Sequence, residues 1–175
     1  LAGVRSLTAG SIPPALELRR LRIELTRATG ARRVELQLQA ARLQREDLED
    51  AEGALSTLRT LVTESGPDGA GFEPLVQLLS AKGAWGELSD LLEARAALPS
   101  TGKGRAEHLE RAVTIAEDHA TAVGEQRRER LYRQLLAVRP DDEDLRWRLL
   151  RLLRDAERYN DLAEELSRLI AQRDG

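Results

Sequence analysis

The residues with the clearest chemical potential lie on one predicted helix, residues 142–155. At 100° per residue, Trp147, Arg151 and Arg154 gather on the face opposite a leucine stripe. The predicted stripe consists of Leu145, Leu149, Leu152 and Leu153. An arginine fork binds carboxylates, and a tryptophan adds apolar contact area at low entropic cost. We therefore predict that these three residues, together with Arg148, bind an acidic or C-terminal peptide. The alternative is that Trp147 packs on a following repeat and that the arginines are solvated.

Three other motifs resemble chemical sites, but their spacing does not fit. Residues 100–104 contain a Gly-Lys pair, yet they lack the first glycine and the final hydroxyl residue of a phosphate loop, and no strand precedes them. Residues 141–144 are acidic but open a helix, where carboxylates cap free N–H groups. His108 and His119 have no clear third zinc ligand. We therefore predict no enzyme activity, no cofactor and no metal.

The apolar pattern of the chain repeats at a spacing of 72 to 74 residues. The matched pairs include Ala40 with Ala112, Leu58 with Leu131, Val76 with Leu149, Trp85 with Tyr159, Leu88 with Leu162, and Leu92 with Leu166. The drift in spacing needs one extra residue near 116–130 and another near 153–158, where loops are predicted. What recurs is mostly apolar, so the repeat reproduces a core, and the two aromatic residues are expected to be core residues. A stack of such units favours binding over catalysis.

The elements that carry this pattern are helices, so the predicted fold class is all-α. Helical periodicity and the breakers between apolar runs predict nine helices, at residues 15–28, 31–47, 49–64, 71–82, 85–97, 105–120, 125–138, 142–155 and 159–172. Their short connections predict antiparallel helical hairpins.

The repeat also predicts how the chain is divided. Residues 1–14 form an irregular N-terminal segment, and residues 15–30 are the second half of a truncated preceding repeat. Residues 31–104 and 105–175 are two four-helix modules of one continuous repeat domain.

The C-terminal module resembles a tetratricopeptide repeat. The residues that carry the resemblance are Pro140, Leu149, Leu150, Leu153, Tyr159, Leu162 and Leu166, and in the preceding unit Ala116, Tyr132 and Leu135. The resemblance implies an α-solenoid, a superhelix of helical hairpins in which the first helix of each pair lines a concave groove. It places Trp147, Arg151 and Arg154 in that groove. The implied function is a non-catalytic scaffold that binds a partner protein or peptide on its concave face.

Composition limits the remaining function classes. The net charge is −3, so no general basic field favours nucleic acid. No apolar run is long enough for membrane insertion, and the absence of cysteine leaves the redox compartment open. We expect a cytoplasmic protein, with the periplasm as the open alternative. Arginine greatly outnumbers lysine and no methionine is present, which suggests a piece of a longer bacterial protein.

Charge is unevenly distributed, and two further interpretations stay open. Residues 1–45 are basic and residues 46–125 acidic, which would steer partners or neighbouring copies, unless these are only solvated helix faces. Exposed repeat ends would also allow self-association. The alternative function is a helical regulatory or sensor region of a larger enzyme or DNA-binding regulator.

Overall fold

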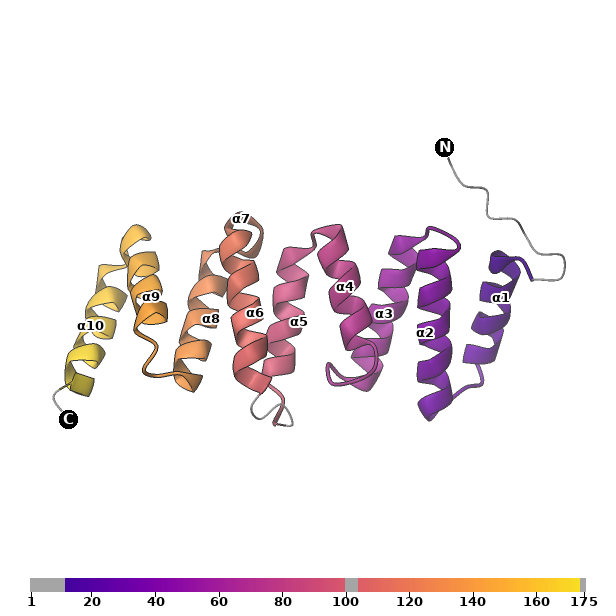
Figure 1. The fold of residues 1–175 in the computed structure, drawn as a ribbon, viewed down its shortest axis with the longest axis horizontal. Helices are drawn as coiled ribbons and strands as arrows, with labels where there is room; N and C mark the ends of the chain where they lie inside the picture. The colour runs from indigo at the N-terminus through magenta and orange to yellow at the C-terminus, as the bar shows by residue number, and fades with distance from the viewer. Residues whose placement is uncertain (1–11, 100–103, 174–175) are drawn as a thin grey trace. The chain divides into compact units, whose positions relative to one another are not determined.

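The computed structural model describes residues 12–99 and 104–173, with side chains as far as Ile170. This part of the chain contains ten helices and no strand, so the protein is all-α (Figure 1). The helices are α1 (Pro14–Leu25), α2 (Gly30–Glu46), α3 (Ala51–Ser65), α4 (Phe72–Lys82), α5 (Trp85–Ala96), α6 (Gly104–Asp118), α7 (Ala120–Val123), α8 (Glu125–Val138), α9 (Glu143–Asp155) and α10 (Tyr159–Arg173).

All nine predicted helices are present, with ends within three residues of the predicted ones. The tenth helix, α7, lies where the sequence predicted a loop. His119 leaves the helical conformation after α6, with φ −124° and ψ 44°, and Gly124 ends α7 with φ 86°. A positive φ of this kind is accessible to glycine at little steric cost. Four residues between two such breaks are too few to show a helical period, which is why the sequence pattern missed this helix.

Contacts between Cα atoms divide the chain into two compact units, residues 1–81 and 82–175. In the first unit, α2 packs against both α1 and α3. The contact between α1 and α2 is apolar and is centred on Leu18, Leu21, Leu36 and Ala40, with Leu25 and Leu43 packed around them. These residues bring antiparallel helices together, as the helical-hairpin prediction requires.

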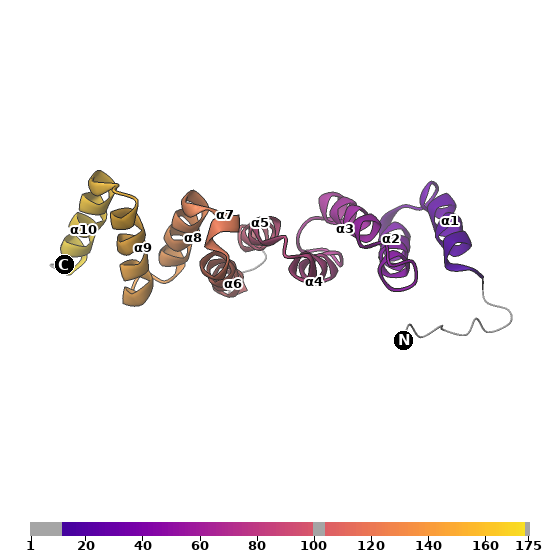
Figure 2. The ribbon, with the colours of Figure 1, turned by 90° about the horizontal axis from the view of Figure 1, so that it is seen from above.

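In the second unit, as for α1, α2 and α3 in the first, helices that follow one another in the chain pack side by side. Here α6 packs against α5 and α8, α9 packs against α8 and α10, and the short helix α7 contacts α5, α6 and α8 (Figure 2). The most deeply buried leucines of the unit, each at most 1% exposed, are Leu92, Leu109, Leu131, Leu149 and Leu153. Antiparallel hairpins are therefore present within each unit, while the continuous superhelix remains a prediction.

Burial shows where the repeat gains its extra residues. The buried positions Gln37, Ala40, Ala41 and Gln44 of α2 recur 72 residues later as Leu109, Ala112, Val113 and Ala116 of α6. Three buried positions of α4, Leu75, Val76 and Leu79, recur 74 residues later as Leu149, Leu150 and Leu153 of α9, and a spacing of 73 aligns fewer of them. In α8, too, the buried Glu129, Tyr132 and Leu135 lie 74 residues after the buried Leu55, Leu58 and Leu61 of α3. Both extra residues therefore fall between α6 and α8, around α7. The sequence had placed one of them near 153–158, and burial shows that none is needed there.

A polar contact links α2 to α3 in the first unit. Arg33 donates from Nε and Nη2 to the two carboxylate oxygens of Glu64, each at 2.9 Å, and Gln37 donates to the same carboxylate at 3.0 Å. Arg33 also donates to the carbonyl oxygen of Leu25, at the end of α1, at 3.1 Å. These hydrogen bonds, that from Arg33 first, lower the pKa of Glu64 from 4.5 to about 2. One arginine therefore connects three helices.

The stability of the first unit should fall as the pH falls from about 4.5 to about 2. The folded state lowers the pKa of Glu64, so its contribution is present above the unfolded value and is lost as protonation approaches the folded value. Both side chains are exposed, so added salt should reduce the effect. Urea unfolding across this pH range should show that the free energy of unfolding of Glu64→Gln declines less steeply than that of the parent protein. The control is Glu73→Gln, which removes an exposed carboxylate that has no ion pair in the described residues. Its free energy of unfolding should decline with falling pH as steeply as that of the parent protein.

Candidate partner-binding groove

The helix that carries the predicted binding residues, α9, begins with an acidic cap. The carboxylate of Asp142 accepts a hydrogen bond from the backbone N–H of Leu145 at 3.0 Å, and Glu143 and Asp144 lie in the first turn. These negative charges stabilise the N-terminal end of the helix dipole. The acidic run 141–144 is therefore a helix start, as the sequence predicted.

One face of α9 is buried, and the opposite face carries the predicted site. The buried residues are Leu145, Leu149, Leu150 and Leu153. Leu150 therefore takes the place in the buried stripe that the sequence gave to Leu152, which is half-buried. The side chain of Trp147 is 60% exposed, so it does not belong to the core of its own hairpin. A large exposed indole on an otherwise charged face is available for contact with another molecule.

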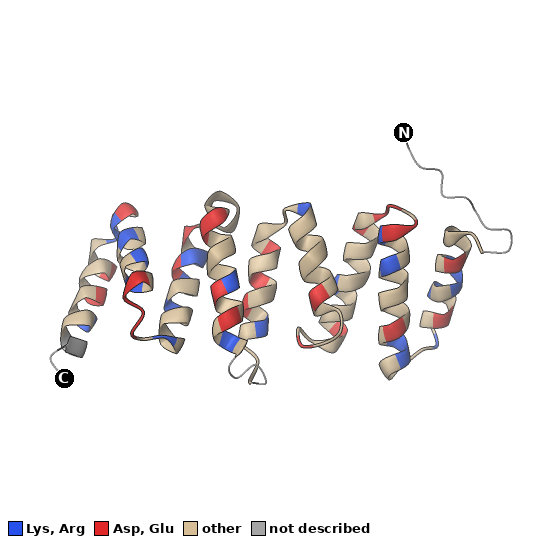
Figure 3. Cartoon of the chain, viewed as in Figure 1, with Lys and Arg blue, Asp and Glu red and all other residues tan. Residues whose placement is uncertain are grey.

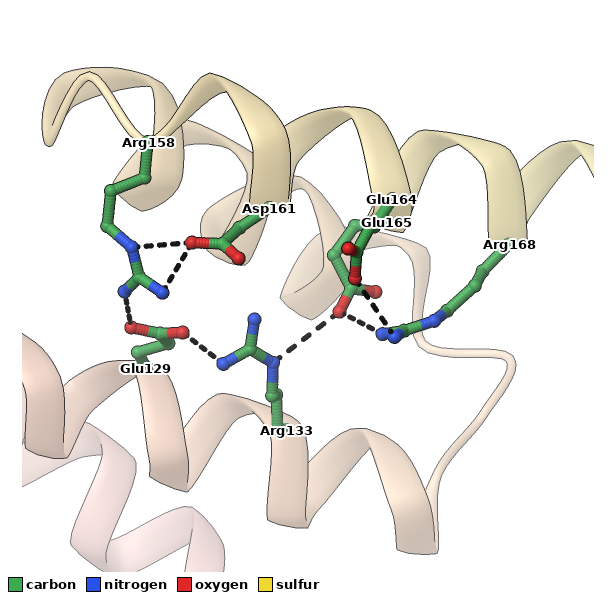
Figure 4. A network of polar contacts seen from close by, with 7 residues as sticks. All are labelled: Glu129, Arg133, Arg158, Asp161, Glu164, Glu165 and Arg168. Atoms are coloured by element: carbon green, nitrogen blue, oxygen red, sulfur yellow. Dashed lines mark hydrogen bonds and ion pairs between the residues drawn. The ribbon is translucent and has the colours of Figure 1, made fainter.

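The next helix, α10, is held against α8 by a network of charged side chains (Figure 4). The buried carboxylate of Glu129 on α8 accepts hydrogen bonds from Arg133 on the same helix and from Arg158, the residue just before α10. Arg133 continues the network to Glu165 on α10 at 3.5 Å, and Arg158 also donates to Asp161 at 2.7 Å. Each charge in the network meets an opposite charge, so the cluster positions α10.

Glu129→Gln should lower the stability of the second unit by about 1–3 kcal/mol, because a neutral amide would face two arginine donors with one of its own donor groups. Glu164→Gln is the matched control, since Glu164 is exposed and its one ion pair with a described residue is to Arg168, at 3.5 Å. Its cost should stay within about 0.5 kcal/mol. Thermal melts of both variants would check this. Equal losses would show that the buried carboxylate does not hold α10 in place.

A groove with a volume of about 290 Å³ lies between α9 and α10. It is lined by Trp147, Leu150, Arg151, Arg154, Leu162 and Leu166. Three of the four predicted site residues therefore line one open groove with an apolar floor of leucines. Leu162 and Leu166 belong to the site as well, although the sequence placed them in the core because they repeat the buried Leu88 and Leu92 of α5.

The charges at the rim of this groove are available to a ligand. Arg151 has no carboxylate partner among the described residues. Within the described part of the chain, Arg154 pairs only with its exposed neighbour Asp155, at 2.8 Å, a contact of little energetic value. The arginines of α9 are visible as blue bands in Figure 3. The groove therefore offers two guanidinium groups that can be recruited by a carboxylate without breaking a buried ion pair.

Arg148 is the one predicted site residue that lies outside the groove. Its guanidinium donates to Glu117 on α6 at 3.1 Å and also to Asp144 on its own helix. Glu117 in turn accepts a hydrogen bond from the hydroxyl of Tyr132 at 2.7 Å. Burial and this hydrogen bond raise the pKa of Tyr132. Arg148 therefore links α9 to α6 and α8 and is less available to a ligand.

A second groove, with a volume of about 310 Å³, lies in the first unit among α2, α3 and α4. Two arginines line it, Arg42 and Arg45, but Glu46 lies beside them and pairs with both, at 2.9 and 2.7 Å. Its positive charge is thus neutralised from within the groove. An acidic ligand would have to compete with Glu46 there, so the groove on α9 and α10 fits an acidic partner better.

The aromatic residues at the two repeated helix starts behave differently. Trp85 at the start of α5 is half-buried and stacks on His119, with ring centroids 3.8 Å apart and ring planes 2° apart. Its counterpart on α10, Tyr159, is 62% exposed. The expectation that both are core residues is therefore wrong for Tyr159, because no ring in the described residues stacks on it as His119 stacks on Trp85.

Other site types find no support in the described residues. Most of the Gly-Lys motif at 100–104 lies outside them, and no three His, Asp or Glu side chains within them are grouped so as to hold a metal ion. None of the described helices combines the length and the apolar character that crossing a membrane requires. Comparisons of the chain with protein-family models, with curated proteins and with solved structures found no match.

Proposed function

We propose that this protein is a non-catalytic interaction scaffold, built from helical hairpins like those of tetratricopeptide repeats, that binds an acidic peptide segment of a partner protein. The observation that carries the proposal is the groove on α9 and α10. It combines an exposed tryptophan, a leucine floor and two arginines that are free of strong internal ion pairs. Apolar area gives such a site affinity, and the arginines select carboxylates.

The groove defines the ligand that it would accept. Leu150, Leu162 and Leu166 can contact one or two apolar side chains of the peptide. Arg151 and Arg154 can bind carboxylates of the peptide that lie next to those side chains. The site is open, so the peptide remains largely in contact with water and its ordering costs free energy. We expect a modest affinity, with a Kd on the order of 10–100 μM.

A fluorescence anisotropy titration tests this proposal. The probe is a labelled ten-residue peptide with two leucines flanked by four aspartates, and the control is the same peptide with asparagines. The acidic peptide should bind, and its affinity should fall several-fold as salt rises, because exposed charges are screened within about 8 Å at physiological ionic strength. The asparagine peptide should bind at least about tenfold more weakly. Absence of binding, or equal binding of both peptides, would refute the proposal.

A further inference from the structure

One face of α10 repeats the apolar residues of a face of α5, but it is exposed where the face of α5 is buried. This α10 face consists of Tyr159, Leu162, Leu166 and Ile170, which lie within one helical stripe. Their repeat counterparts on α5 are Trp85, Leu88, Leu92 and Ala96. The three aliphatic counterparts are at most 2% exposed, whereas Leu166 and Ile170 are 38% and 62% exposed.

The element that covers α5 is known from the structure. Helix α6 packs along α5 and presents four buried residues to its neighbours, Leu109, Ala112, Val113 and Ala116, and His119 directly after it stacks on Trp85. The pair α1 and α2 repeats this arrangement, with Ala40 of α2, the counterpart of Ala112, packed against Leu18 and Leu21 of α1. Twice in one chain, therefore, a helix that opens such a pair is covered by a helix with a buried alanine at the same repeat position, Ala40 in α2 and Ala112 in α6.

We propose that the α10 face binds an amphipathic helix of a partner protein that carries the stripe of α6. Its first feature is an apolar stripe with small residues at the positions of Ala112 and Ala116, which lets the two helix axes approach closely. Its second feature is a flat ring at the position of His119, which stacks on Tyr159 as His119 stacks on Trp85.

Charge complementarity adds a third feature of the partner helix. Arg151 and Arg154 border Leu162 and Leu166 in the same groove, so a helix on this face brings one flank near two guanidinium groups. Helix α6 is itself acidic, with Glu107, Glu110, Glu117 and Asp118 among its residues. The inference rests on the proposed function, since it states in which conformation the acidic partner binds to that groove and how far the contact extends along α10.

The chain supplies its own probe, a synthetic peptide of residues 104–123, which contains α6, His119 and α7. We expect the labelled peptide to bind the intact protein saturably and to gain helical circular dichroism on binding. The peptide variant Ala112→Arg/Ala116→Arg, which places charges in the stripe, should bind at least about tenfold more weakly. Saturable binding with equal affinity for both peptides would overturn the proposal, as would no binding at all.

Two protein variants locate the contact. Leu166→Arg places a charge on a partly exposed position and should abolish binding of the α6 peptide while the protein keeps its melting temperature. Binding that survives this change would show that the peptide inserts elsewhere, for example in place of α6 itself, and would overturn the inference. Sedimentation of the unlabelled protein tests the competing occupant. A dimer that Leu166→Arg dissociates, with no peptide binding, would assign the face to a second copy of the chain instead.

Tyr159→Ala separates this inference from the proposed function. Tyr159 does not line the groove of Trp147 and Arg151, so the short acidic peptide should bind this variant within about twofold of the parent protein. The α6 peptide should lose about tenfold in affinity, since it loses ring stacking and apolar contact. If the short acidic peptide binds the parent protein and the α6 peptide does not, the proposed function is supported and the helical partner is excluded. If neither binds, both proposals fail.

Discussion

Leu92→Ala should lower the free energy of unfolding of the second unit by about 2–5 kcal/mol, the largest stability loss expected of any single substitution considered for this chain. The side chain of Leu92 is completely buried on α5, in the unit where α6 packs against that helix. Truncation removes its buried apolar surface and leaves a cavity that close-packed neighbours fill only in part. Urea unfolding should show a lower midpoint with little change in slope.

The repeat provides a control with the same substitution at the equivalent position. Leu166 occupies on α10 the place that Leu92 occupies on α5, but its side chain is 38% exposed. Leu166→Ala should therefore cost less than about 1 kcal/mol, because little buried surface and no enclosed cavity are involved. Similar losses for the two variants would contradict this assignment of faces. Such a result would mean that the α10 face is covered in solution.

The helices of this protein could be predicted from its sequence because their boundaries carry local signals. Pro14 opens α1, Gly66 ends α3, and Asp142 caps α9, each by a mechanism that acts within a few residues. Helix α7 could not be predicted, since its four residues hold no period. The position of the two inserted residues also depended on burial, which the apolar pattern alone reports incompletely.

Burial departs from the apolar pattern most clearly in α2. Gln37 and Gln44 are buried at positions where the repeat has Leu109 and Ala116. Gln37 donates to Glu64, and Gln44 accepts a hydrogen bond from the hydroxyl of Thr57 at 2.8 Å. A buried amide costs less when another helix supplies a hydrogen-bond partner. No sequence pattern within α2 reveals those partners, so the sequence underestimated the buried face of this helix.

The candidate site shows the same division between local and long-range information. Helical geometry alone places Trp147, Arg151 and Arg154 on one face, and the structure brings them together in one groove. The pairing of Arg148 could not be predicted, because Glu117 lies 31 residues away on another helix. The leucines of the groove were visible as a repeat of core positions. Their exposure follows only from the absence of a covering helix in the described residues.

Arg151→Glu should reduce binding of the acidic peptide by about 100-fold, which corresponds to about 2.8 kcal/mol. Arg151 is exposed and has no ion pair in the described residues, so the change replaces attraction by repulsion without breaking an internal contact. The melting temperature should therefore remain close to that of the parent protein. Binding is measured by anisotropy at low salt, where the difference is greatest.

Arg22→Glu is the matched control, because Arg22 is an exposed arginine of α1 in the other unit and its side chain makes no hydrogen bond or ion pair with described residues. Both variants change the net charge of the protein equally, so a general field effect would weaken binding in both. A local contact at the groove would weaken it only in Arg151→Glu. Trp147→Ala should lower the affinity of the protein for both the acidic peptide and its asparagine version, because it removes apolar contact rather than charge. If Trp147→Ala weakened binding of the acidic peptide but not of the asparagine peptide, the role assigned to the indole would be contradicted.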